Sequence, residues 1–356
     1  MMFIEKVSYK NLRNLKDETI ALHPKLNILY GQNAQGKTNF LEGIYFSAVG
    51  KSHRTARYKE LIKFDCDFAD IELKINREGL KDRISVNLKQ KKEIAINGQP
   101  INRLGELFGV VYVQLFSPED LNLVKSGPGM RRRLIDLNLC QLSPVYYYEL
   151  GRYYHVLNQR NNLLKSIKKN KTLLDTLTLW DEQLSFHGSK IQKYRAEYIE
   201  EIESISRNLH KRFTDKKENL SLIYKPNTNP EELMPKLKKN LERDILLGST
   251  SAGIHKDDIE IKIDNREAKT YASQGQQRSA VISLKLSWVE YIYKHKSTYP
   301  ILLLDDILSE LDLERGQLLL EETSKVQTIL TCTDKEIIKK SANLFFVENG
   351  YVKQVN

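Results

Sequence analysis

The eight residues Gly31–Thr38 constrain the fold more than any other part of this chain. They read GQNAQGKT and match the pattern G-x-x-x-x-G-K-[ST]. An apolar run, Leu26–Tyr30, precedes them and predicts a strand, and the residues from Thr38 to about Val49 predict a helix. A glycine loop between a strand and a helix turns its backbone N–H groups and the helix N-terminus toward a bound phosphate. The sequence therefore predicts a phosphate-binding loop in an α/β fold.

Each position of this loop has an expected role in binding ATP and Mg²⁺. We expect Lys37 to place its charge on the β- and γ-phosphates and Thr38 to offer its hydroxyl to Mg²⁺. The glycines let the backbone wrap around the β-phosphate. The other positions expected to contact the nucleotide are Gly31, Gln32, Asn33, Ala34, Gln35, Gly36 and Asn39.

A second motif, ILLLDD at Ile301–Asp306, supplies carboxylates. Four apolar residues that end in acids are typical of a buried parallel strand whose carboxyl end carries functional groups. We expect Asp305 to hold Mg²⁺ and Asp306 to orient or deprotonate the attacking water, so that Asp306 and Lys37 are the expected catalytic residues. Taken alone, the motif fits a buried strand with a polar end equally well, and the P-loop upstream favours the catalytic interpretation.

Two short polar motifs lie on either side of this acidic strand. SQGQQRS at Ser273–Ser279 stands just before a predicted helix, and SELD at Ser309–Asp312 follows the acidic pair directly. A small hydroxyl and a glycine at a helix N-terminus can form an anion site. Each motif also fits an ordinary helix N-cap with a polar first turn.

The rest of the sequence predicts an α/β core that is split in two by a helical insertion. Short alternating strands are predicted early in the chain, with a tight hairpin at Asn97-Gly98. Helical spacing from Gly129 to about Lys169 and from Leu173 to Phe213 predicts an antiparallel arm. The predicted domains are a head, residues 1–116 and 246–356, with an N-terminal antiparallel β lobe, and a helical arm, residues 117–245.

The positive charge is concentrated in the middle of the chain. Between Leu121 and Asp244 there are 23 Lys+Arg and 15 Asp+Glu, which accounts for +8 of the net charge of +10. A basic balance of this kind indicates a polyanionic partner such as nucleic acid.

In this order the P-loop, the SQGQQRS signature, the acidic strand and the SELD turn resemble the SMC-like branch of the ABC-type ATPases. Because the insertion is too short for an extended coiled coil, the chain resembles the RecF family within that branch. The resemblance implies an ABC-type/SMC-like P-loop ATPase head with an inserted helical arm. The stretches that resemble the family are KNLRN (Lys10–Asn14), KSHRT (Lys51–Thr55), FSPEDLNLVKSGPGMRRRLID (Phe116–Asp136), YYYELGRYYHVLNQRNNLL (Tyr146–Leu164) and HKDD (His255–Asp258).

The resemblance also implies a function. RecF-like proteins bind DNA, dimerise head-to-head on ATP and hydrolyse ATP slowly, so that the chain is expected to be a weak DNA-stimulated ATPase that uses hydrolysis as a switch. They act with RecO and RecR in recombinational gap repair, replication maintenance and the SOS response, at junctions of single-stranded and duplex DNA. The implied nucleotide contacts are Arg13 and Asn14 from the first strand, and Ser273, Gly275 and Gln276, which would cap the nucleotide of a second subunit.

Three positions bear on how ATP would be hydrolysed. The residues Thr331-Cys332-Thr333 stand where many ABC ATPases carry a histidine, so the γ-phosphate must be contacted differently. Asp306 stands where transporters carry a catalytic glutamate, and its shorter reach fits slow hydrolysis. Gln114 is the candidate for the catalytic Q-loop residue of this class, although it also fits an ordinary strand residue.

Contacts to DNA are predicted from clustered cations, since phosphate contacts need only positive charges on one accessible face. A solvated charged surface is the alternative for each residue. The tyrosines at 146–148 and 153–154 could stack bases, but packing between arm helices is favoured. The candidate DNA-binding residues are Lys51, His53, Arg54 and Arg57 beside the P-loop helix, and Arg131, Arg132 and Arg133 at the start of the arm.

Other classes of protein fit less well. No run approaches the roughly 18 apolar residues of a membrane span, and the N-terminus reads as an amphipathic strand, so a cytoplasmic protein is expected. Cys66, Cys140 and Cys332 are isolated, which favours reduced thiols over a zinc site or disulfides. Two alternative functions fit the sequence less well: a transporter motor subunit, which the basic arm disfavours, and a purely structural SMC-like head, which the lack of long heptad arms disfavours.

Overall fold

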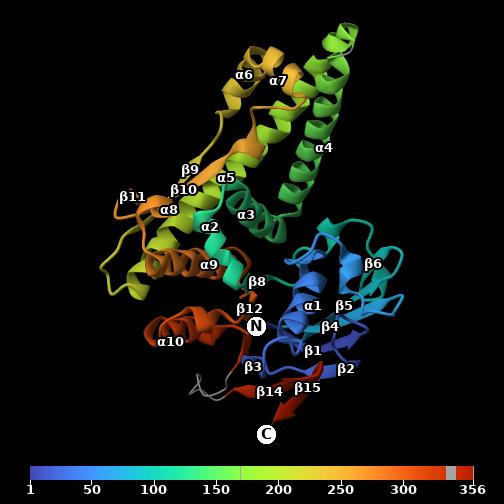
Figure 1. Ribbon diagram of the computed structural model, residues 1–356, viewed down its shortest axis with the longest axis vertical. Helices are drawn as coiled ribbons and strands as arrows, with labels where there is room; N and C mark the ends of the chain where they lie inside the picture. The colour runs from blue at the N-terminus through green and yellow to red at the C-terminus, as the bar shows by residue number, and fades with distance from the viewer. Residues whose placement is uncertain (169, 334–341, 356) are drawn as a thin grey trace. The chain divides into compact units, whose positions relative to one another are not determined.

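Figure 1 shows the protein as a computed structural model that describes residues 1–168, 170–333 and 342–355. The chain forms two compact units. The first contains Met1–Asp120 and Trp288–Asn356, and the second contains Leu121–Ser287. The first boundary lies close to the one predicted at residue 116, whereas the second lies near residue 287 and not near residue 246.

An antiparallel sheet forms the N-terminal lobe of the first unit. Apolar and polar residues alternate along its strands, so that Leu73 and Ile75 are buried while Lys74 between them is exposed. Its hairpin has positive φ at both Asn97 and Gly98, which confirms the predicted turn. In order across the sheet the strands are β2 (Glu18–Ala21), β1 (Met2–Lys10), β4 (Ala69–Arg77), β5 (Leu80–Leu88), β6 (Lys92–Ile96) and β7 (Gln99–Pro100).

A second sheet of the first unit is mostly parallel. Only its edge pair, β14 and β15, is antiparallel. Every residue of β8, β12 and β13 is buried, as central parallel strands covered on both faces require. This confirms the buried strand predicted from ILLLDD. In order the strands are β15 (Tyr351–Val355), β14 (Asn343–Glu348), β3 (Leu26–Tyr30), β13 (Thr328–Cys332), β12 (Ile301–Asp305) and β8 (Val113–Phe116).

Helix α1 (Lys37–Val49) lies between these two sheets (Figure 1). It contacts β4 and β5 of the antiparallel sheet and β8, β12 and β13 of the parallel sheet. Every residue from Phe40 to Val49 is buried, so the helix has no solvent-facing stripe. The Tyr9 hydroxyl on β1 donates to the carbonyl oxygen of Phe40 at 2.6 Å and ties the lobe to the helix.

The second unit contains a helical hairpin. Helices α4 (Pro144–Ile167) and α5 (Leu177–Phe213) pack side by side in opposite directions (Figure 1). The sequence predicted one helix from Gly129 to about Lys169, but the chain breaks into α3 (Pro128–Leu142) and α4. The break occurs because Pro144 cannot continue the backbone ladder and Ser143 caps α4 by accepting from the Tyr146 amide at 3.2 Å.

Residues that follow α5 belong to the same unit. Strand β10 (Asp258–Ile263) pairs antiparallel with β9 (Leu220–Lys225) and β11 (Arg266–Glu267) and does not join the parallel sheet. Residues 246–287 therefore pack with the arm, whereas the sequence assigned them to the head. The remaining helices of this unit are α2 (Asn122–Lys125), α6 (Leu233–Lys239), α7 (Leu241–Leu247), α8 (Ala268–Tyr271) and the start of α9 (Gln274–Lys296).

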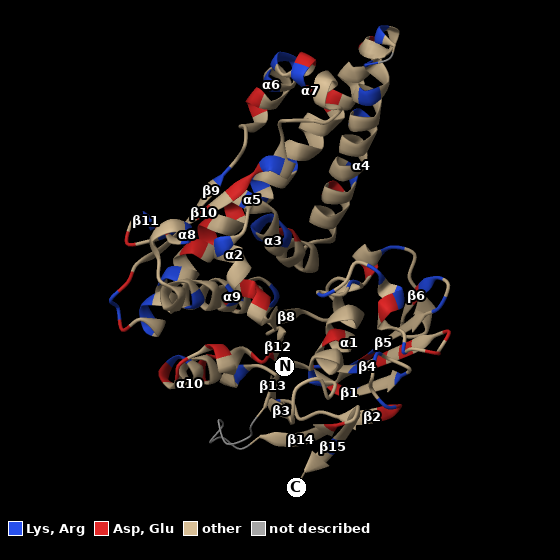
Figure 2. Cartoon of the chain, in the orientation of Figure 1, with Lys and Arg blue, Asp and Glu red and all other residues tan. Residues whose placement is uncertain are grey.

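Two fully buried arginines connect the parts of the second unit. Arg195 donates to Asp136 at 2.8 Å, to Asp257 at 3.0 Å and to the Ile254 carbonyl oxygen at 2.8 Å. A similar set holds Arg160, which donates to Asp181, Asp244 and Thr250. The helices of this unit carry both Lys/Arg and Asp/Glu (Figure 2), and because these arginine pairs are buried, part of the charge counted in the arm is internal. No helix of the described residues is long and apolar enough to cross a membrane.

Candidate nucleotide site

The predicted P-loop lies between β3 and α1, and glycines determine its path. Gly31 and Gly36 have φ values of 148° and 119°, which L side chains rarely adopt. A Cβ atom on Gly31 would also lie 2.3 Å from the carbonyl oxygen of Val347 on β14. The loop therefore passes too close to the neighbouring strand for any residue larger than glycine at position 31.

Helix α1 begins with free N–H groups. Its N-cap residue is Gly36, which offers no side-chain acceptor, and its first turn has no acidic residue. The first N–H groups of a helix have no partner within it, and the helix dipole places partial positive charge there. This end of α1 thus has the chemistry of an anion site.

Lys37 folds its ammonium group back onto the loop. Its Nζ donates to the carbonyl oxygens of Gly31 at 2.6 Å and Gln32 at 2.8 Å. Burial lowers the pKa of Lys37, and the nearby carboxylates of Asp306 and Asp305 act in the opposite direction. A buried cation with two neutral acceptors gains free energy by exchanging them for phosphate oxygens.

Thr38 and Asp305 lie together, as expected for a Mg²⁺ site. The Thr38 hydroxyl donates to Asp305 Oδ1 at 2.9 Å, and Thr331 Oγ1 from β13 donates to the same oxygen at 2.8 Å. Burial raises the pKa of Asp305, the two hydroxyls oppose this, and the negative charges of Asp306 and Glu119 add to it. The net shift is upward, so a divalent cation would stabilise the ionised carboxylate here.

Asp306 leaves the end of β12 in a left-handed conformation with φ of 50°. Its amide donates to Thr331 Oγ1 at 3.0 Å, and its carbonyl oxygen accepts from Ser309 Oγ at 2.7 Å. The Thr331 hydroxyl thus contacts both members of the acidic pair. The predicted SELD turn continues into α10 (Leu313–Glu322), where Asp312 is the N-cap and accepts from the Arg315 amide.

Arg13 and Asn14 follow strand β1 and lie near the P-loop and helix α1. Asn14 Nδ2 donates to the Ala34 carbonyl oxygen of the P-loop at 3.2 Å, and Asn14 Oδ1 accepts from Asn39. The Arg13 side chain instead makes two hydrogen bonds of 3.1 Å to the buried Glu42 of α1. Asn14 therefore borders the loop, whereas Arg13 is held by a carboxylate.

Gln114 does not reach the acidic pair. On β8 it lies beside Leu302 of β12, three residues before Asp305. Because side chains alternate along a strand and register partners share a face, Gln114 points to the face opposite Asp305. The predicted Q-loop role for Gln114 is therefore wrong on geometry: its side chain is buried in the sheet, with no partner for Nε2 among the described residues.

The signature residues lie in the second unit, at the start of α9. The Ser273 amide donates to Gln276 Oε1 at 2.8 Å, and Ser273 Oγ accepts from the Gln276 amide at 3.2 Å. This is a reciprocal capping box, so the alternative of a helix N-cap is present in the structure. Since Ser273 Oγ accepts, its proton remains able to donate to an external anion; Gly275 follows in the same exposed turn.

Two of the predicted DNA contacts are occupied internally. Arg131 is buried, pairs with Asp258 at 2.7 and 2.9 Å and also binds two carbonyl oxygens. Arg132 donates to the Asp257 carbonyl oxygen at 2.5 Å and is half-buried. The prediction is wrong for Arg131, because a buried, paired guanidinium cannot meet a phosphate. Arg133 is exposed.

The cations after α1 differ in their surroundings. Lys51 and Arg57 are exposed. Arg54 Nη1 donates to Asn39 at 2.8 Å and lies 3.4 Å from Glu42. His53 packs edge-on against the ring of Tyr45.

Three residues of this region have contacts that the motifs did not predict. Glu42 is buried and joins Arg13, Arg54 and Ser52. Burial alone raises the pKa of Glu42, but hydrogen bonds from Arg13 and Ser52 lower it below its usual value. The others are Glu119, whose negative charge raises the pKa of Asp305, and Thr331, which the strand register places beside Asp305. Only Glu42 carries a sequence signal, as an acid within an otherwise apolar helix.

The arrangement fits a nucleoside triphosphate with Mg²⁺. The loop supplies free N–H groups and Lys37 for phosphates, and Thr38 and Asp305 supply two oxygens for the metal. The described residues contain no group of three His, Cys, Asp or Glu side chains that could hold a metal by itself. This composition suits Mg²⁺, which takes its other ligands from phosphate and water.

Similarity to known proteins extends over nearly the whole chain. A family model described as the RecF/RecN/SMC N terminal domain matches residues 3–353. The DNA replication and repair protein RecF of Lachnoclostridium phytofermentans is 45% identical over 337 residues, which cover 94% of this chain and 94% of that protein. The protein of the same name from Clostridium botulinum strain Okra is 42% identical over 366 residues, 99% of this chain and 100% of that one.

A solved structure is also similar to this chain. It is that of the recombination mediator protein RecF with ATP in the RecFOR pathway, and it superimposes with a TM-score of 0.94 at 32% sequence identity. The match covers 100% of this chain and 98% of that one.

Proposed function

Because this chain belongs to the RecF/RecN/SMC family and, within it, to the RecF proteins, we propose that it is an ATP-dependent DNA-binding protein of recombinational gap repair. It binds ATP and Mg²⁺, dimerises head-to-head on ATP at junctions of single-stranded and duplex DNA, and hydrolyses ATP slowly with stimulation by DNA. It works with RecO and RecR in the cytoplasm, and it contributes to replication maintenance and SOS induction.

The P-loop site carries this proposal. Uncapped N–H groups, a buried Lys37 and the Thr38–Asp305 contact supply the groups that bind and orient a triphosphate. The bound Mg²⁺ would neutralise phosphate charge. Asp306 lies beside Asp305 and is the group proposed to orient water, and its backbone is fixed by Thr331 and Ser309.

The dimer follows from the chemistry of the α9 terminus. Ser273 is held in one orientation by Gln276 and still has a proton to donate. A serine hydroxyl with a glycine at a helix N-terminus suits a γ-phosphate. We therefore assign Ser273, Gly275 and Gln276 to the nucleotide of a second copy of this chain, so that ATP joins two heads.

DNA contacts are proposed for the exposed cations. These are Lys51, Arg54 and Arg57 in the first unit and Arg133 in the second. Phosphate contacts of this kind give affinity without sequence preference.

Light scattering with and without ATP tests the dimer. Ser273→Arg is expected to stay monomeric with ATP, and Lys37→Arg likewise, whereas Asp306→Asn is expected to dimerise and dissociate more slowly. Ser204→Arg, an exposed serine on α5, is the matched control and should dimerise normally. Normal dimerisation of Ser273→Arg would overturn the assignment of the signature to a second subunit.

A further inference from the structure

One buried histidine connects the end of the long arm helix α5 to the signature helix α9. His210 lies in the last turn of α5 and is fully buried. Its Nε2 lies 3.1 Å from Glu218 Oε2, and its Nδ1 lies 3.4 Å from Ser283 Oγ on α9. The two nitrogens of one ring thus join two segments that are distant from each other in the sequence.

The chemistry of its two partners explains how His210 can hold both. A carboxylate only accepts, so Nε2 carries a proton and donates it to Glu218. A hydroxyl can donate or accept, so Ser283 can bond to Nδ1 whether or not that nitrogen is protonated. The contact between His210 and α9 is therefore available to the neutral ring and to the charged one.

Along α9, hydroxyl groups continue from Ser283 toward the signature turn, Ser273–Gln276. Ser283 Oγ donates to the Ser279 carbonyl oxygen at 2.7 Å, and Ser279 Oγ donates to the Gly275 carbonyl oxygen at 3.1 Å. Both serines are fully buried. The face of α9 that contacts the histidine is therefore the face that leads back to the glycine of the signature turn.

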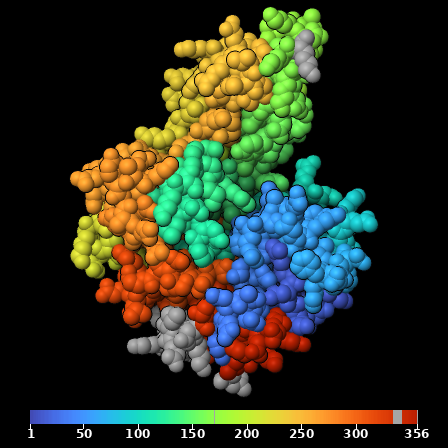
Figure 3. Space-filling model, viewed as in Figure 1, coloured from blue at the N-terminus to red at the C-terminus, as the bar shows by residue number. Residues whose placement is uncertain are grey.

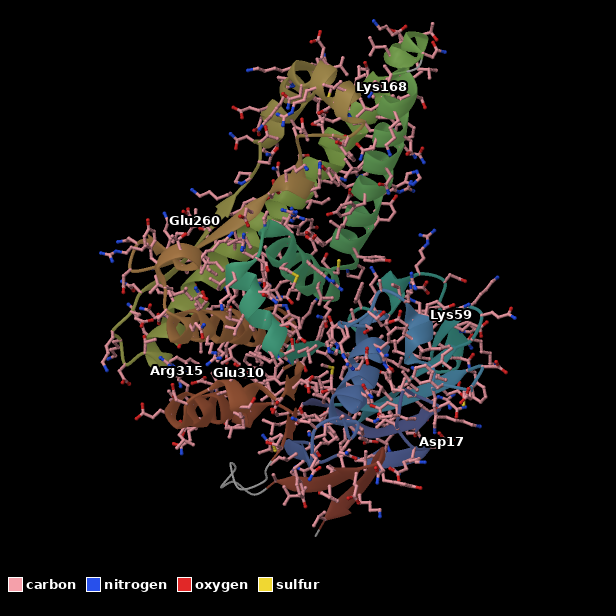
Figure 4. The ribbon with its side chains drawn as sticks, in the orientation of Figure 1. Asp17, Lys59, Lys168, Glu260, Glu310 and Arg315 are labelled. Carbon is pink, nitrogen blue, oxygen red and sulfur yellow. The ribbon has the colours of Figure 1, made fainter. Side chains whose placement is uncertain are left out.

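At its other end the contact is fixed to a sheet. Glu218 lies two residues before β9. Its neighbour Asn219 exchanges two hydrogen bonds of 2.9 Å with Asp264, which follows β10. Strand β10, whose Glu260 is labelled in Figure 4, pairs with β9 along its length. His210 thus holds α9 against a segment that the sheet of the second unit keeps in place.

The signature turn needs support from within the unit because its own residues are exposed. Ser273 and Gln274 are exposed, and α8 with the residues that follow it lies in the orange part of the surface in Figure 3. Gln277 supplies one support, since its Nε2 donates to the carbonyl oxygens of Ala268 and Ala272 at 3.2 and 3.1 Å. Groups that bind a ligand keep their geometry only when neighbouring side chains hold them in this way.

We infer that His210 is a positioning residue for the signature turn. By joining Ser283 to Glu218, it sets the place of α9, and so of Ser273, within the second unit. The inference rests on the proposed function, in which the signature turn caps the nucleotide of a second copy, and it adds a residue that acts on this cap through α9. Loss of the contact should impair ATP-dependent dimerisation and leave ATP binding by the P-loop unchanged, since the P-loop belongs to the first unit.

Light scattering at increasing ATP concentration tests this inference. His210→Phe keeps a ring and removes both nitrogens, so it should raise the ATP concentration at half-maximal dimerisation by about 5- to 30-fold. Ser283→Ala should have a similar effect, and the double variant should lose little more, because both changes remove the same contact. Ser287→Ala is the matched control, since Ser287 is equally buried one turn later on α9 and donates to the Leu284 carbonyl oxygen at 2.6 Å.

Two conservative variants separate positioning from packing. The side-chain amide of Asn lies as many bonds from Cα as Nδ1 of His, and that of Gln lies as many as Nε2. His210→Asn should therefore restore most of the ATP dependence of the unaltered protein, whereas His210→Gln should not. If His210→Asn dimerises no better than His210→Phe, or only His210→Gln restores dimerisation, the contact with Ser283 is not the link and the inference is overturned.

Binding of a fluorescent ATP analogue separates the two ways in which the result could fail. All variants are expected to bind the analogue as the unaltered protein does. Weaker analogue binding by Ser283→Ala, equal to its loss of dimerisation, would place the effect at the P-loop and overturn the inference. If the unaltered protein does not dimerise with ATP, the proposed function fails; if it dimerises and Ser283→Ala needs no more ATP, only the inference fails.

Discussion

The Thr331 hydroxyl lies 2.8 Å from Asp305 Oδ1 and accepts the amide of Asp306 at 3.0 Å. One fully buried oxygen on β13 therefore fixes the carboxylate of one acid and the backbone of the next. This threonine stands in the segment where many ABC ATPases carry a histidine, and in this chain it acts on the acidic pair.

Replacing Thr331 is expected to impair the acidic pair without disturbing the sheet. Thr331→Val keeps the shape and removes the hydroxyl, so Mg²⁺-dependent ATP hydrolysis should fall by about 10- to 100-fold, with Thr331→Ser restoring most of it. Thr328→Val on the same strand is the control, because Thr328 is buried and its Oγ1 has no partner among the described residues. Equal activities of the two valine variants would argue against a positioning role.

Removal of a buried arginine should destabilise the arm far more than removal of an exposed one. Arg195→Met leaves the carboxylates of Asp136 and Asp257 without their shared cation, at a cost of about 3–5 kcal/mol. Arg207→Met on the same helix removes an exposed pair with Glu203 worth roughly 0.3–0.5 kcal/mol. Urea unfolding followed by circular dichroism measures both, and similar midpoints would show that the buried network contributes little.

Stability is expected to fall in acid because of His255. Burial lowers its pKa to about 4, and the ring accepts from Tyr153 at Nδ1 and donates to the Thr250 carbonyl oxygen. Its contribution is complete above the unfolded pKa of about 6.5 and is lost as pH falls toward 4, since only the unfolded chain then takes up the proton. The loss is on the order of 2 kcal/mol after screening.

Calorimetric melting between pH 4 and 8 checks this expectation. The His255→Gln variant should lose part of the pH dependence, whereas His155→Gln, at an exposed position of α4, should keep the profile of the unaltered protein. Identical profiles for all three proteins would rule out His255 as the source.

DNA affinity should depend steeply on salt if phosphate contacts supply it. For duplex DNA each lost contact reduces the slope of log affinity against log salt by about 0.9. Lys51→Ala is expected to reduce the slope by about one contact, and Lys6→Ala, an exposed lysine of β1, should leave it unchanged. A flat salt response of the unaltered protein would exclude the phosphate-contact account.

Local motifs predicted the residues of the nucleotide site better than they predicted which distant segments pack together. The P-loop and the ILLLDD strand depend on neighbouring residues, so strand, loop and helix could all be read directly. Gln114 could not be placed, because its position depends on which residue of β12 lies beside it. From the sequence, Arg131 looks like a surface cation. In the fold it pairs with Asp258, which lies 127 residues later in the chain.

The extent of the arm was missed for a related reason. Alternating residues at Asp258–Ile263 predict a strand but not its partner, and the strand pairs with β9 and not with the parallel sheet. Thr331 gains its place beside Asp305 only through the parallel register of β12 and β13.

The two buried arginines also predict an order of events during synthesis. The helical hairpin leaves the ribosome before the segment that completes its charge pairs, since Asp244 follows Arg160 by 84 residues and Asp257 follows Arg195 by 62. Until those acids arrive, the hairpin would bury incompletely neutralised guanidinium groups, which is unfavourable. We therefore expect the arm to reach its final packing only after the chain has been made through Asp257, which lies just before the segment that leads to the signature helix.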